Sequence, residues 1–294
     1  MPNSNLEKSR GPGTSVVIPC YNASEYISNA ISSALLSGVD EIIVVDDGST
    51  DNSVAIAKQL GAIVIEQVNS GPAISRMNGL IGSNFQNVIF LDADDELIPE
   101  GVRELSHQLQ IDEYLVGSVG TTLVRRGGKI RGKIDVEPKG LTFESLLLRG
   151  LPPGPPACAT WRVSAILNAT QGHVPEPKTN HAEDYAFFLA MANYGRIAKI
   201  DTNVCVYSAG QGRSSKNIER GLSDVDEIRK FYSGISGVEI KSRSSRELSQ
   251  LIHFRLYYEA SWSTPIFKVK NLFISFFKGP SKFLKGLISK LWSF

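Results

Sequence analysis

The sequence has 294 residues, of which 42% are hydrophobic and 21% are charged, a composition typical of one large globular domain with extensions. Its 31 basic and 30 acidic residues nearly cancel to a formal net charge of +1, so the chain as a whole lacks the charge of a nucleic-acid-binding protein. Three scattered cysteines without a CxxC pair exclude a zinc knuckle of the usual spacing and favour a reducing compartment over a disulfide framework.

Neither a signal peptide nor a transmembrane helix is predicted from the sequence. Residues 1–13 are polar, so we predict a disordered lead-in there and not a signal peptide. No run of about 18 uncharged apolar residues occurs, so a transmembrane helix is not expected.

Strands and helices are predicted to alternate over the first hundred residues. The predicted strands are 14–19, 41–47, 63–67 and 87–92, and the predicted helices are 22–38, 53–62, 72–83 and 100–110. In the first helix, Asn22 or Ser24 is expected to cap the start and Gly38 to lie at the end. Near-continuous apolar strands that alternate with helices predict an α/β fold, with a mostly parallel sheet covered by helices on both faces.

The pattern changes after residue 112. We predict strands or a hairpin around Gly127 and Gly128, a helix at 141–150, a proline-rich loop leading to a strand and a helix, an amphipathic helix at 181–195 and a strand at 196–208. A shift in composition near residue 210 predicts a change of organisation. The predicted division is a catalytic domain at 14–210, with halves at 14–112 and 113–210, followed by a helical extension at 211–264.

The last thirty residues, 265–294, contain six lysines and no acid. After the Gly279-Pro280 break, apolar residues recur at helical spacing and the lysines lie off that stripe. This pattern predicts helices that lie in a membrane interface with basic side chains near anionic headgroups. The alternative is a pair of helices packed on the catalytic domain.

Acidic residues follow two of the predicted strands. Asp46 and Asp47 end the second strand, and Asp92 and Asp94 end the fourth. Ligands of open α/β sheets bind outside the carboxyl ends of the strands, so both groups should face one crevice. Mg²⁺ and Mn²⁺ prefer oxygen ligands and often take only one or two carboxylates, with phosphates and water completing the shell. The alternative is an acidic turn that caps the helix after Pro99, because a D-x-D motif alone is weak evidence.

Four segments taken in order carry a family resemblance. VVIPCYNASEYISNAISSAL, EIIVVDDGSTDNS, GPAISRMNGLIGS and VIFLDADDELIP resemble the family 2 glycosyltransferases of the GT-A fold over residues 14–110, and HAEDYAFF extends the resemblance to about residue 208. The resemblance implies an inverting, metal-dependent hexosyl- or N-acetylhexosaminyltransferase. Its donor would be a nucleotide-diphosphate sugar, expected to be a UDP-sugar, and its cofactor Mn²⁺ or Mg²⁺.

The resemblance also implies roles for individual residues. Pro19 and Tyr21 match the loop that lines the base pocket, Asp47 an acid that contacts the base, Arg76 an arginine near the diphosphate, Asp92 an acid facing the ribose, Asp94 the metal ligand and Asp184 the catalytic base. A carboxylate on the acceptor side removes the hydroxyl proton as the new bond forms, and this is the chemical reason for a base at Asp184. The alternative for Glu183 and Asp184 is that they complement the dipole of the helix they begin. Glu183 is equally a candidate for supporting the residues that contact the ligand.

Three further candidates depend on weaker signals. Many relatives carry an arginine and a histidine after a tyrosine near the end of the domain, whereas this chain has VYSAGQGRSSKN. A histidine metal ligand is therefore not expected, and Arg213 becomes the candidate contact for the diphosphate. His181 precedes the acids and is a candidate contact for the acceptor, with a structural role as the alternative. Trp161 lies where relatives contact the acceptor, with core packing as the alternative.

The favoured function is sugar transfer from a nucleotide donor to an acceptor glycan or glycolipid in the synthesis of a cell-surface polysaccharide or lipopolysaccharide. A cytoplasmic protein held at the inner face of the membrane by 265–294 is expected, with no nucleic-acid partner. Two alternatives are a sugar nucleotidyltransferase and a non-catalytic nucleotide-sugar-binding protein. The first would need a basic, glycine-rich triphosphate loop near the N-terminus, where the sequence reads PCYNASEY.

Overall fold

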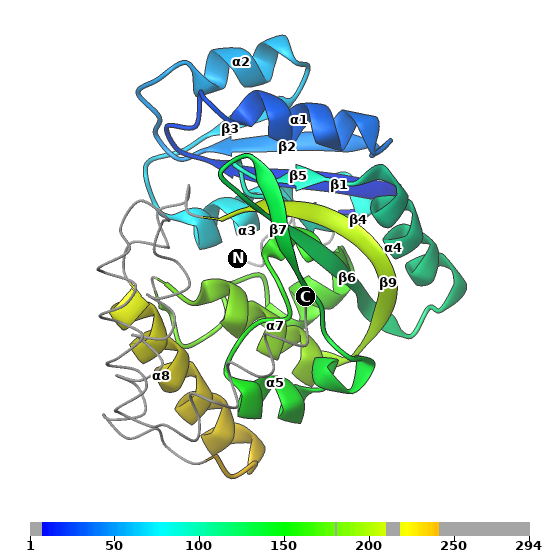
Figure 1. Ribbon diagram of the computed structural model, residues 1–294, viewed down its shortest axis with the longest axis vertical. Helices are drawn as coiled ribbons and strands as arrows, with labels where there is room; N and C mark the ends of the chain where they lie inside the picture. The colour runs from blue at the N-terminus through cyan, green and yellow to red at the C-terminus, as the bar shows by residue number, and fades with distance from the viewer. Residues whose placement is uncertain (1–7, 180, 210–217, 241–294) are drawn as a thin grey trace. The chain divides into compact units, whose positions relative to one another are not determined.

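The computed structural model describes residues 8–179, 181–209 and 218–240 (Figure 1). The chain divides into two compact units: Met1–Lys178 with Glu183–Ala209, and Thr179–Ala182 with Gly210–Phe294. The division after Ala209 falls beside the predicted boundary at 210. Most of the predicted extension and the whole of the predicted tail at 265–294 lie outside the described residues, as do residues 1–7 of the predicted lead-in.

The first unit is built on a mixed sheet whose strands lie in the order β3-β2-β1-β4-β8-β6-β9-β5, with β7 paired to β6. The strands are β1 Gly11–Cys20, β2 Glu41–Asp46, β3 Ile63–Glu66, β4 Phe85–Phe90, β5 Glu96–Leu97, β6 Leu115–Arg126, β7 Lys129–Ile134, β8 Ala159–Arg162 and β9 Arg196–Ser208. The first four strands are parallel, β8 is antiparallel to both of its neighbours, and β6 and β9 run parallel. The prediction of a mostly parallel sheet is therefore confirmed for β1–β4, whereas the other half is mixed, with β6 and β9 parallel and the pairings of β5, β7 and β8 antiparallel. Strand β8 has only four residues, ATWR, and so short a segment does not encode direction, so its residues alone did not reveal the reversal.

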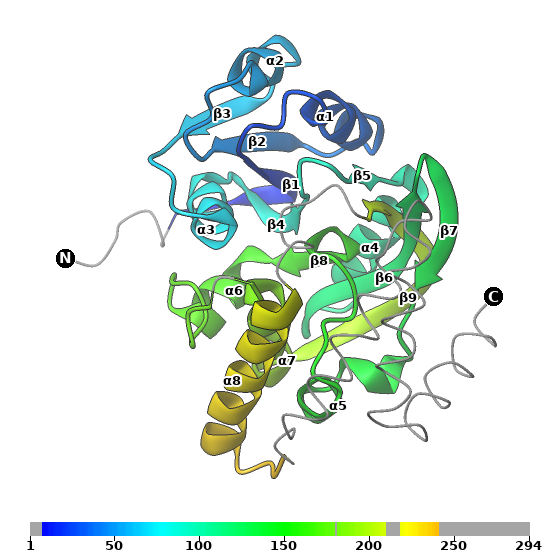
Figure 2. The ribbon, with the colours of Figure 1, turned by 60° about the vertical axis from the view of Figure 1, so that its left-hand side comes forward.

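Helices cover both faces of the parallel half, as predicted (Figure 2). The helices of the first unit are α1 Ile27–Leu36, α2 Ser53–Gln59, α3 Pro72–Gly82, α4 Pro99–Ile111, α5 Phe143–Arg149, α6 Val163–Thr170 and α7 Glu183–Tyr194, with the short 3₁₀ turns η1 Pro138–Leu141 and η2 Pro156–Cys158. Right-handed crossovers place α1 and α2 together on one face and α3, which follows the outermost strand β3, on the other. The second unit contains α8, Ile218–Ser236. None of the described helices has the length and apolar character needed to cross a bilayer.

Two local predictions are wrong. Strand β1 begins at Gly11, so residues 11–13 belong to the sheet and not to a disordered lead-in. Helix α1 begins at Ile27, after Tyr26, so neither Asn22 nor Ser24 caps it. Asn22 instead has a positive φ of 49° and accepts the backbone N–H of Thr50 at 2.8 Å, which uses its side chain to join two loops.

The loops after β1 and β2 are joined by several such bonds. Asp47 donates its backbone N–H to the carbonyl of Cys20 at 2.7 Å. Asp51 accepts the backbone N–H groups of Ser24 and Ser53, each at 3.0 Å, and so supports the start of α2. These bonds fix the carboxyl edge of β1 and β2 as one rigid surface.

Helix α3 rests closely on that sheet through Gly79. A Cβ at this position would lie 2.3 Å from Val17 Cγ1 and 3.0 Å from Val45 Cγ2. Alanine favours helices over glycine, but here the clash with β1 and β2 outweighs propensity. We expect Gly79→Ala to lower the free energy of unfolding by about 1–3 kcal/mol in urea titrations. Gly82→Ala, in the same helix, meets only the flexible tip of Ile65 at 3.0 Å and is the control; an equal loss in both variants would contradict the packing argument.

Candidate active site

An arginine joins the acids of two distant segments. Arg76 lies in α3, Asp92 follows β4, and Glu183 begins α7. Arg76 Nη2 donates to Asp92 Oδ1 at 2.6 Å, and Arg76 Nη1 lies 3.8 Å from Glu183 Oε1. The structure therefore brings the predicted donor-side acids and the predicted acceptor-side acids to one point at the carboxyl edge of the sheet.

Arg76 is held charged in a largely buried position. Only 12% of its side chain is exposed. Burial alone would lower the pKa of the guanidinium, but the carboxylates of Asp92 and Glu183 outweigh that effect and raise it. The Nε–H is buried and has no hydrogen-bond partner among the described residues, so the group keeps capacity to donate to an anionic ligand.

Asp94 carries the charge that Arg76 does not neutralise. Burial, followed by repulsion from Asp92, raises the pKa of its carboxyl to about 6. Nothing in the described part of the chain gathers three or more His, Cys, Asp or Glu side chains into a ready-made metal cage. The carboxylates of Asp94 and Asp92 nevertheless fit Mg²⁺ or Mn²⁺, which is commonly held by one or two carboxylates while phosphates and water supply the remaining ligands.

This unfavourable burial predicts a stabilising substitution. The folded chain holds the Asp94 proton more tightly than the unfolded chain does, so the group's contribution to stability falls as pH rises from the ordinary pKa of 3.8 to about 6. We expect Asp94→Asn to raise the free energy of unfolding at pH 7 by roughly 1–2 kcal/mol, with a smaller difference near pH 4. Urea titrations at both pH values measure this. Asp201→Asn, at a fully exposed carboxylate, should show no gain, and an unchanged Asp94→Asn at pH 7 would contradict the argument.

Glu183 and Asp184 share the first turn of α7 but differ in surroundings. Burial, followed by the adjacent Asp184, raises the pKa of Glu183 to about 7, although Arg76 lowers it. Asp184 accepts its neighbour's N–H, from Tyr185, at 2.8 Å. Two carboxylates with unlike environments suit a division of roles, one facing the arginine and one left for proton transfer.

A small, mainly apolar cavity of about 30 Å³ lies behind these groups. Its wall includes Met77, Phe90 and Phe187 together with Arg76 and Glu183. A space of this size is comparable to the volume of a single water molecule. The apolar wall is the physical reason that the ionised form of Glu183 is disfavoured.

Trp161 belongs to the core, so its predicted contact with an acceptor is wrong and the packing alternative is correct. Its side chain is fully buried, and its ring meets the rings of Phe187 and Phe188 edge to face, each at 5.3 Å between centroids. Helix α7 is likewise buried on most of its surface, which corrects the prediction of an amphipathic helix. The helix packs against α5, α6 and strands β6 and β9, leaving little of it for solvent.

Asp47 lies at the predicted edge, with most of its hydrogen-bonding capacity used within the chain. Its Oδ1 accepts from Gln67 Nε2 at 2.8 Å and from the Ser70 N–H at 2.6 Å, and its Oδ2 accepts the Gly71 N–H at 2.9 Å. A carboxylate offers about four acceptor sites, so about one remains. Asp47 therefore fixes the loop that leads into α3, and its contact with a nucleotide base stays a prediction.

The remaining predicted residues lie in different parts of the chain. Pro19 is buried in β1, and Tyr21 follows it at the same edge, half-buried. Their part in a base pocket stays a prediction. His181 belongs to the second unit, where its Nδ1 lies 3.5 Å from Asp224 Oδ2. Its contact with an acceptor also stays a prediction, and Arg213 lies outside the described residues.

Sequence reasoning missed how the acid-bearing turn is fastened. Asp95 is 1% exposed, and its Oδ1 accepts the backbone N–H of Ser208 at 2.8 Å. Glu96 forms a two-pronged pair with Arg125, at 2.5 and 3.0 Å. These contacts tie the turn to the ends of β6 and β9. The run of acids was visible in the sequence, but its partners lie 29 and 113 residues away.

Comparison with known proteins gives this geometry a family. The model of the family described as Glycosyl transferase family 2 matches residues 15–165, about half of the chain. The chain is 38% identical over 92 residues to the uncharacterized glycosyltransferase YibD of Escherichia coli, covering 29% of this chain and 27% of that protein. It is 27% identical over 196 residues to the putative teichuronic acid biosynthesis glycosyltransferase TuaG of Bacillus subtilis, covering 64% of this chain and 75% of that protein. It is 30% identical over 128 residues to the succinoglycan biosynthesis protein ExoU of Rhizobium meliloti, covering 41% of this chain and 37% of that protein.

Solved structures show the same fold. TarS of S. aureus, in complex with UDP-GlcNAc, superposes with a TM-score of 0.59 at 20% identity, covering 92% of this chain and 82% of that one. Glucosyl-3-phosphoglycerate synthase of Mycobacterium tuberculosis, in complex with Mn²⁺, UDP and phosphoglyceric acid, superposes with a TM-score of 0.54 at 24% identity, covering 78% and 82%. The architecture is thus a GT-A-like mixed sheet flanked by helices. With the family model matching half of the sequence, the chain belongs to glycosyltransferase family 2 and is a glycosyltransferase.

Proposed function

We propose that this glycosyltransferase moves a sugar from a UDP-sugar to an acceptor hydroxyl, with inversion at the anomeric carbon, in the assembly of a cell-surface polysaccharide. The observation that carries the proposal is Arg76, placed between Asp92 of the donor half and Glu183 of the acceptor half. The names of TuaG and ExoU support a role in polysaccharide synthesis, and the ligands of TarS and the mycobacterial synthase support a uridine donor.

On the donor side, Arg76 binds the diphosphate and Asp94 would hold a divalent cation. When bound, the cation stabilises the negative charge that develops on the leaving diphosphate. Asp92 stays oriented towards the ribose by its bond to Arg76. Pro19 and Tyr21 line the base pocket, Asp47 offers its remaining acceptor site to the base, and Arg213 is a second contact for the diphosphate.

On the acceptor side, Asp184 acts as the base. The acceptor oxygen attacks the anomeric carbon, the bond between that carbon and the diphosphate oxygen breaks, and the hydroxyl proton passes to Asp184. Glu183 orients Arg76 and shields the diphosphate site from behind. His181 is proposed to contact the acceptor. The basic segment 265–294 would hold the enzyme at the inner face of the membrane, where a lipid-linked acceptor is available.

The proposal is tested by following thermal stability while UDP, GDP, dTDP and CMP are added with and without Mn²⁺. A ligand that binds only the folded state raises the melting temperature by mass action. We expect a metal-dependent rise with UDP that is lost in Asp94→Ala and kept in the exposed control Asp201→Ala. No rise with UDP in folded protein, or the same rise with all four nucleotides, would reject a uridine donor.

A further inference from the structure

A strongly basic hairpin stands at the margin of the sheet. Strands β6 and β7 are joined by Gly127 and Gly128, whose φ values of 56° and 75° suit a tight two-residue turn. The ten residues 125–134 contain five basic residues and no acid. Among the described strands, β7 pairs with β6 alone (Figures 1 and 2). Every residue of Lys129–Lys133 is exposed.

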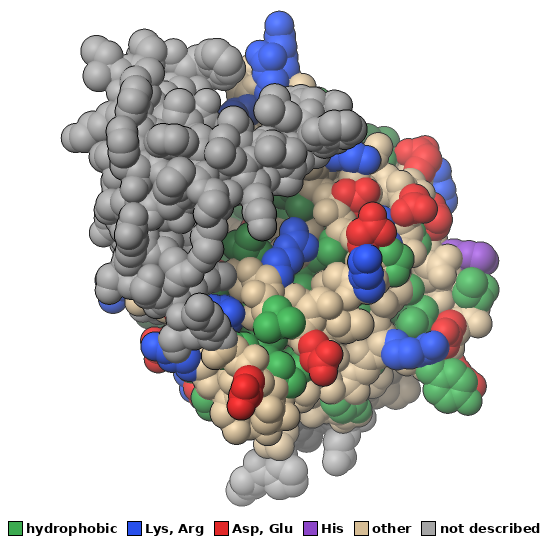
Figure 3. All heavy atoms as spheres, turned by 60° about the horizontal axis from the view of Figure 1, so that its bottom comes forward, with side chains coloured by type: hydrophobic (Ala, Val, Ile, Leu, Met, Phe, Trp, Pro, Cys, Tyr) green, Lys and Arg blue, Asp and Glu red, His purple; other side chains and the backbone are tan. Residues whose placement is uncertain are grey.

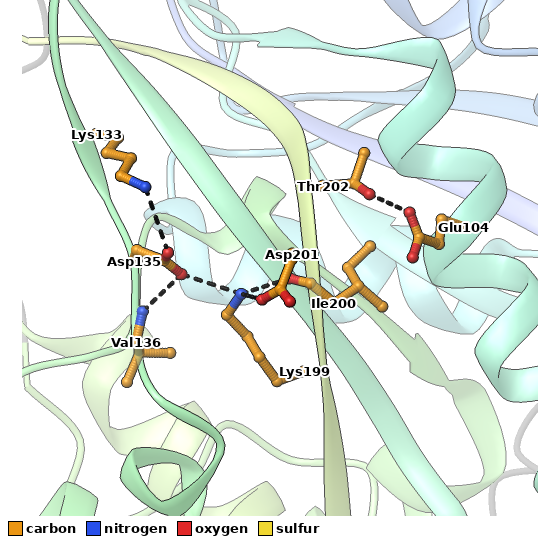
Figure 4. Close-up of polar contacts among 8 residues, drawn as sticks. All are labelled: Glu104, Lys133, Asp135, Val136, Lys199, Ile200, Asp201 and Thr202. Carbon is orange, nitrogen blue, oxygen red and sulfur yellow. Dashed lines mark hydrogen bonds and ion pairs between the residues drawn. The ribbon is translucent and has the colours of Figure 1, made fainter.

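Two of these five basic residues, Lys129 and Arg131, have no acidic partner among the described residues. Arg125 is neutralised by Glu96. Asp135 follows β7, but its nearer partner is the buried Lys199, at 3.0 Å, while Lys133 lies 3.7 Å away (Figure 4). Lys129 and Arg131 form no ion pair with any described residue.

The basic strip contrasts with other exposed surface of the chain. On the face drawn in Figure 3, the described acidic and basic side chains are mixed with one another and with hydrophobic ones. Lys129, Arg131 and Lys133 instead lie within five consecutive exposed residues of β7, where a bulge in the pairing with β6 interrupts the regular alternation. Within a screening length of about 8 Å at physiological salt, neighbouring charges of one sign reinforce each other.

The hairpin rises from the edge of the sheet that carries the acidic site. Arg125 pairs in register with Ser208, whose N–H is bound by Asp95, and its guanidinium holds Glu96. A surface that contacts the hairpin would therefore lie on the same side as the ends of β4 and β6.

We infer that the tip of this hairpin, residues 126–133, docks on an anionic lipid surface. The side chains of Lys129, Arg131 and Lys133 are exposed, which suits a diffuse layer of phosphate headgroups better than a small ligand. Each basic residue near such a surface strengthens binding roughly fivefold. Docking there turns the catalytic edge towards the bilayer. The inference concerns where the protein binds and stands whether or not the proposed donor is correct.

One competing explanation is structural. An edge strand exposes unpaired backbone groups, and lysines on it prevent edge-to-edge association. The two explanations predict different failures when the charges are removed: loss of lipid binding, or association of the protein with itself.

The experiment is cosedimentation of the full chain with extruded vesicles. The vesicles contain either phosphatidylcholine alone or phosphatidylcholine with about 30% phosphatidylglycerol, which supplies the anionic headgroups. The test variant is Lys129→Gln/Arg131→Gln/Lys133→Gln. The control is Lys58→Gln/Arg103→Gln/Lys178→Gln, which makes the same change of net charge at three exposed residues that each face a carboxylate. We expect the test variant to bind anionic vesicles up to about a hundredfold more weakly, and the control to bind within about twofold of the wild type. The loss should shrink in high salt.

Three results would overturn the inference. Equal losses in both variants would assign the effect to net charge. Unchanged vesicle binding with new self-association, seen by light scattering, would assign the lysines to edge protection. Unchanged vesicle binding with loss of binding to inorganic polyphosphate would assign the strip to a soluble polyanion. Circular dichroism and the UDP titration on the same samples establish that the variants are folded and keep their nucleotide site.

Discussion

Asp184→Asn is expected to lower the rate of sugar transfer by about 10²–10⁴-fold while leaving UDP binding nearly unchanged. Asparagine keeps the shape of the side chain but cannot take the proton of the acceptor hydroxyl. Its amide oxygen can still accept the backbone N–H of Tyr185, which Asp184 Oδ1 accepts at 2.8 Å in the first turn of α7. Initial rates of transfer and calorimetric titration with UDP measure the two quantities separately.

The matched comparison is Glu183→Gln, the adjacent acid in the same turn. It should weaken donor binding more than Asp184→Asn does, because Glu183 faces Arg76 at 3.8 Å. The exposed Asp201→Asn should leave both quantities unchanged. If Glu183→Gln abolished transfer and Asp184→Asn spared it, the base would be Glu183 and the proposed division of roles would be reversed.

Arg76→Met is expected to lower the free energy of unfolding by about 2–4 kcal/mol at pH 7. It removes the cation from between Asp92 and Glu183, which leaves two poorly hydrated carboxylates facing each other. Arg76 lowers the pKa of Glu183, so without the arginine that pKa rises further, the folded state binds the Glu183 proton more tightly, and the loss of stability shrinks as pH falls towards 4. Urea titrations between pH 4 and 8 follow this trend.

Arg76→Lys tests whether charge alone is sufficient. A lysine restores a positive charge but not the fixed fork of donors, so it should recover part of the stability and little of the UDP affinity. A variant Arg76→Met as stable as the wild type at pH 7 would show that water already neutralises the acids. Full recovery of UDP binding by Arg76→Lys would show that the diphosphate needs only a point charge.

The parallel half of the fold was predictable because each strand and helix there has its own pattern and punctuation. The boundaries were less so. Asn22 looks like a helix cap, yet its side chain is used to hold Thr50 in the neighbouring loop. In the second half, β8 consists of four residues, too few for any pattern to fix its direction. The division between units after Ala209 coincides with a change in composition that the sequence does show.

For the candidate site, the sequence indicated residues but not how their side chains are joined. The resemblance indicated Arg76, Asp92 and Asp94 one by one, and the structure joins the first two with Glu183. It did not indicate that Asp95 and Glu96 are structural partners of Ser208 and Arg125, since such contacts depend on how β6 and β9 return to β4. An acid-rich turn reads the same in the sequence whether its members hold a ligand or hold the chain.

Because a single guanidinium bridges the two halves of the first unit, neither half contains a complete donor site. Residues 14–112 supply Asp92 and Asp94, but Glu183 arrives only with α7. Under the donor role proposed for Arg76, exchange of residues 113–210 between relatives must preserve this junction or lose affinity for the donor. Selection for a new acceptor and selection for an old donor would act on the same three side chains, those of Arg76, Asp92 and Glu183. This limits how independently the two specificities can evolve.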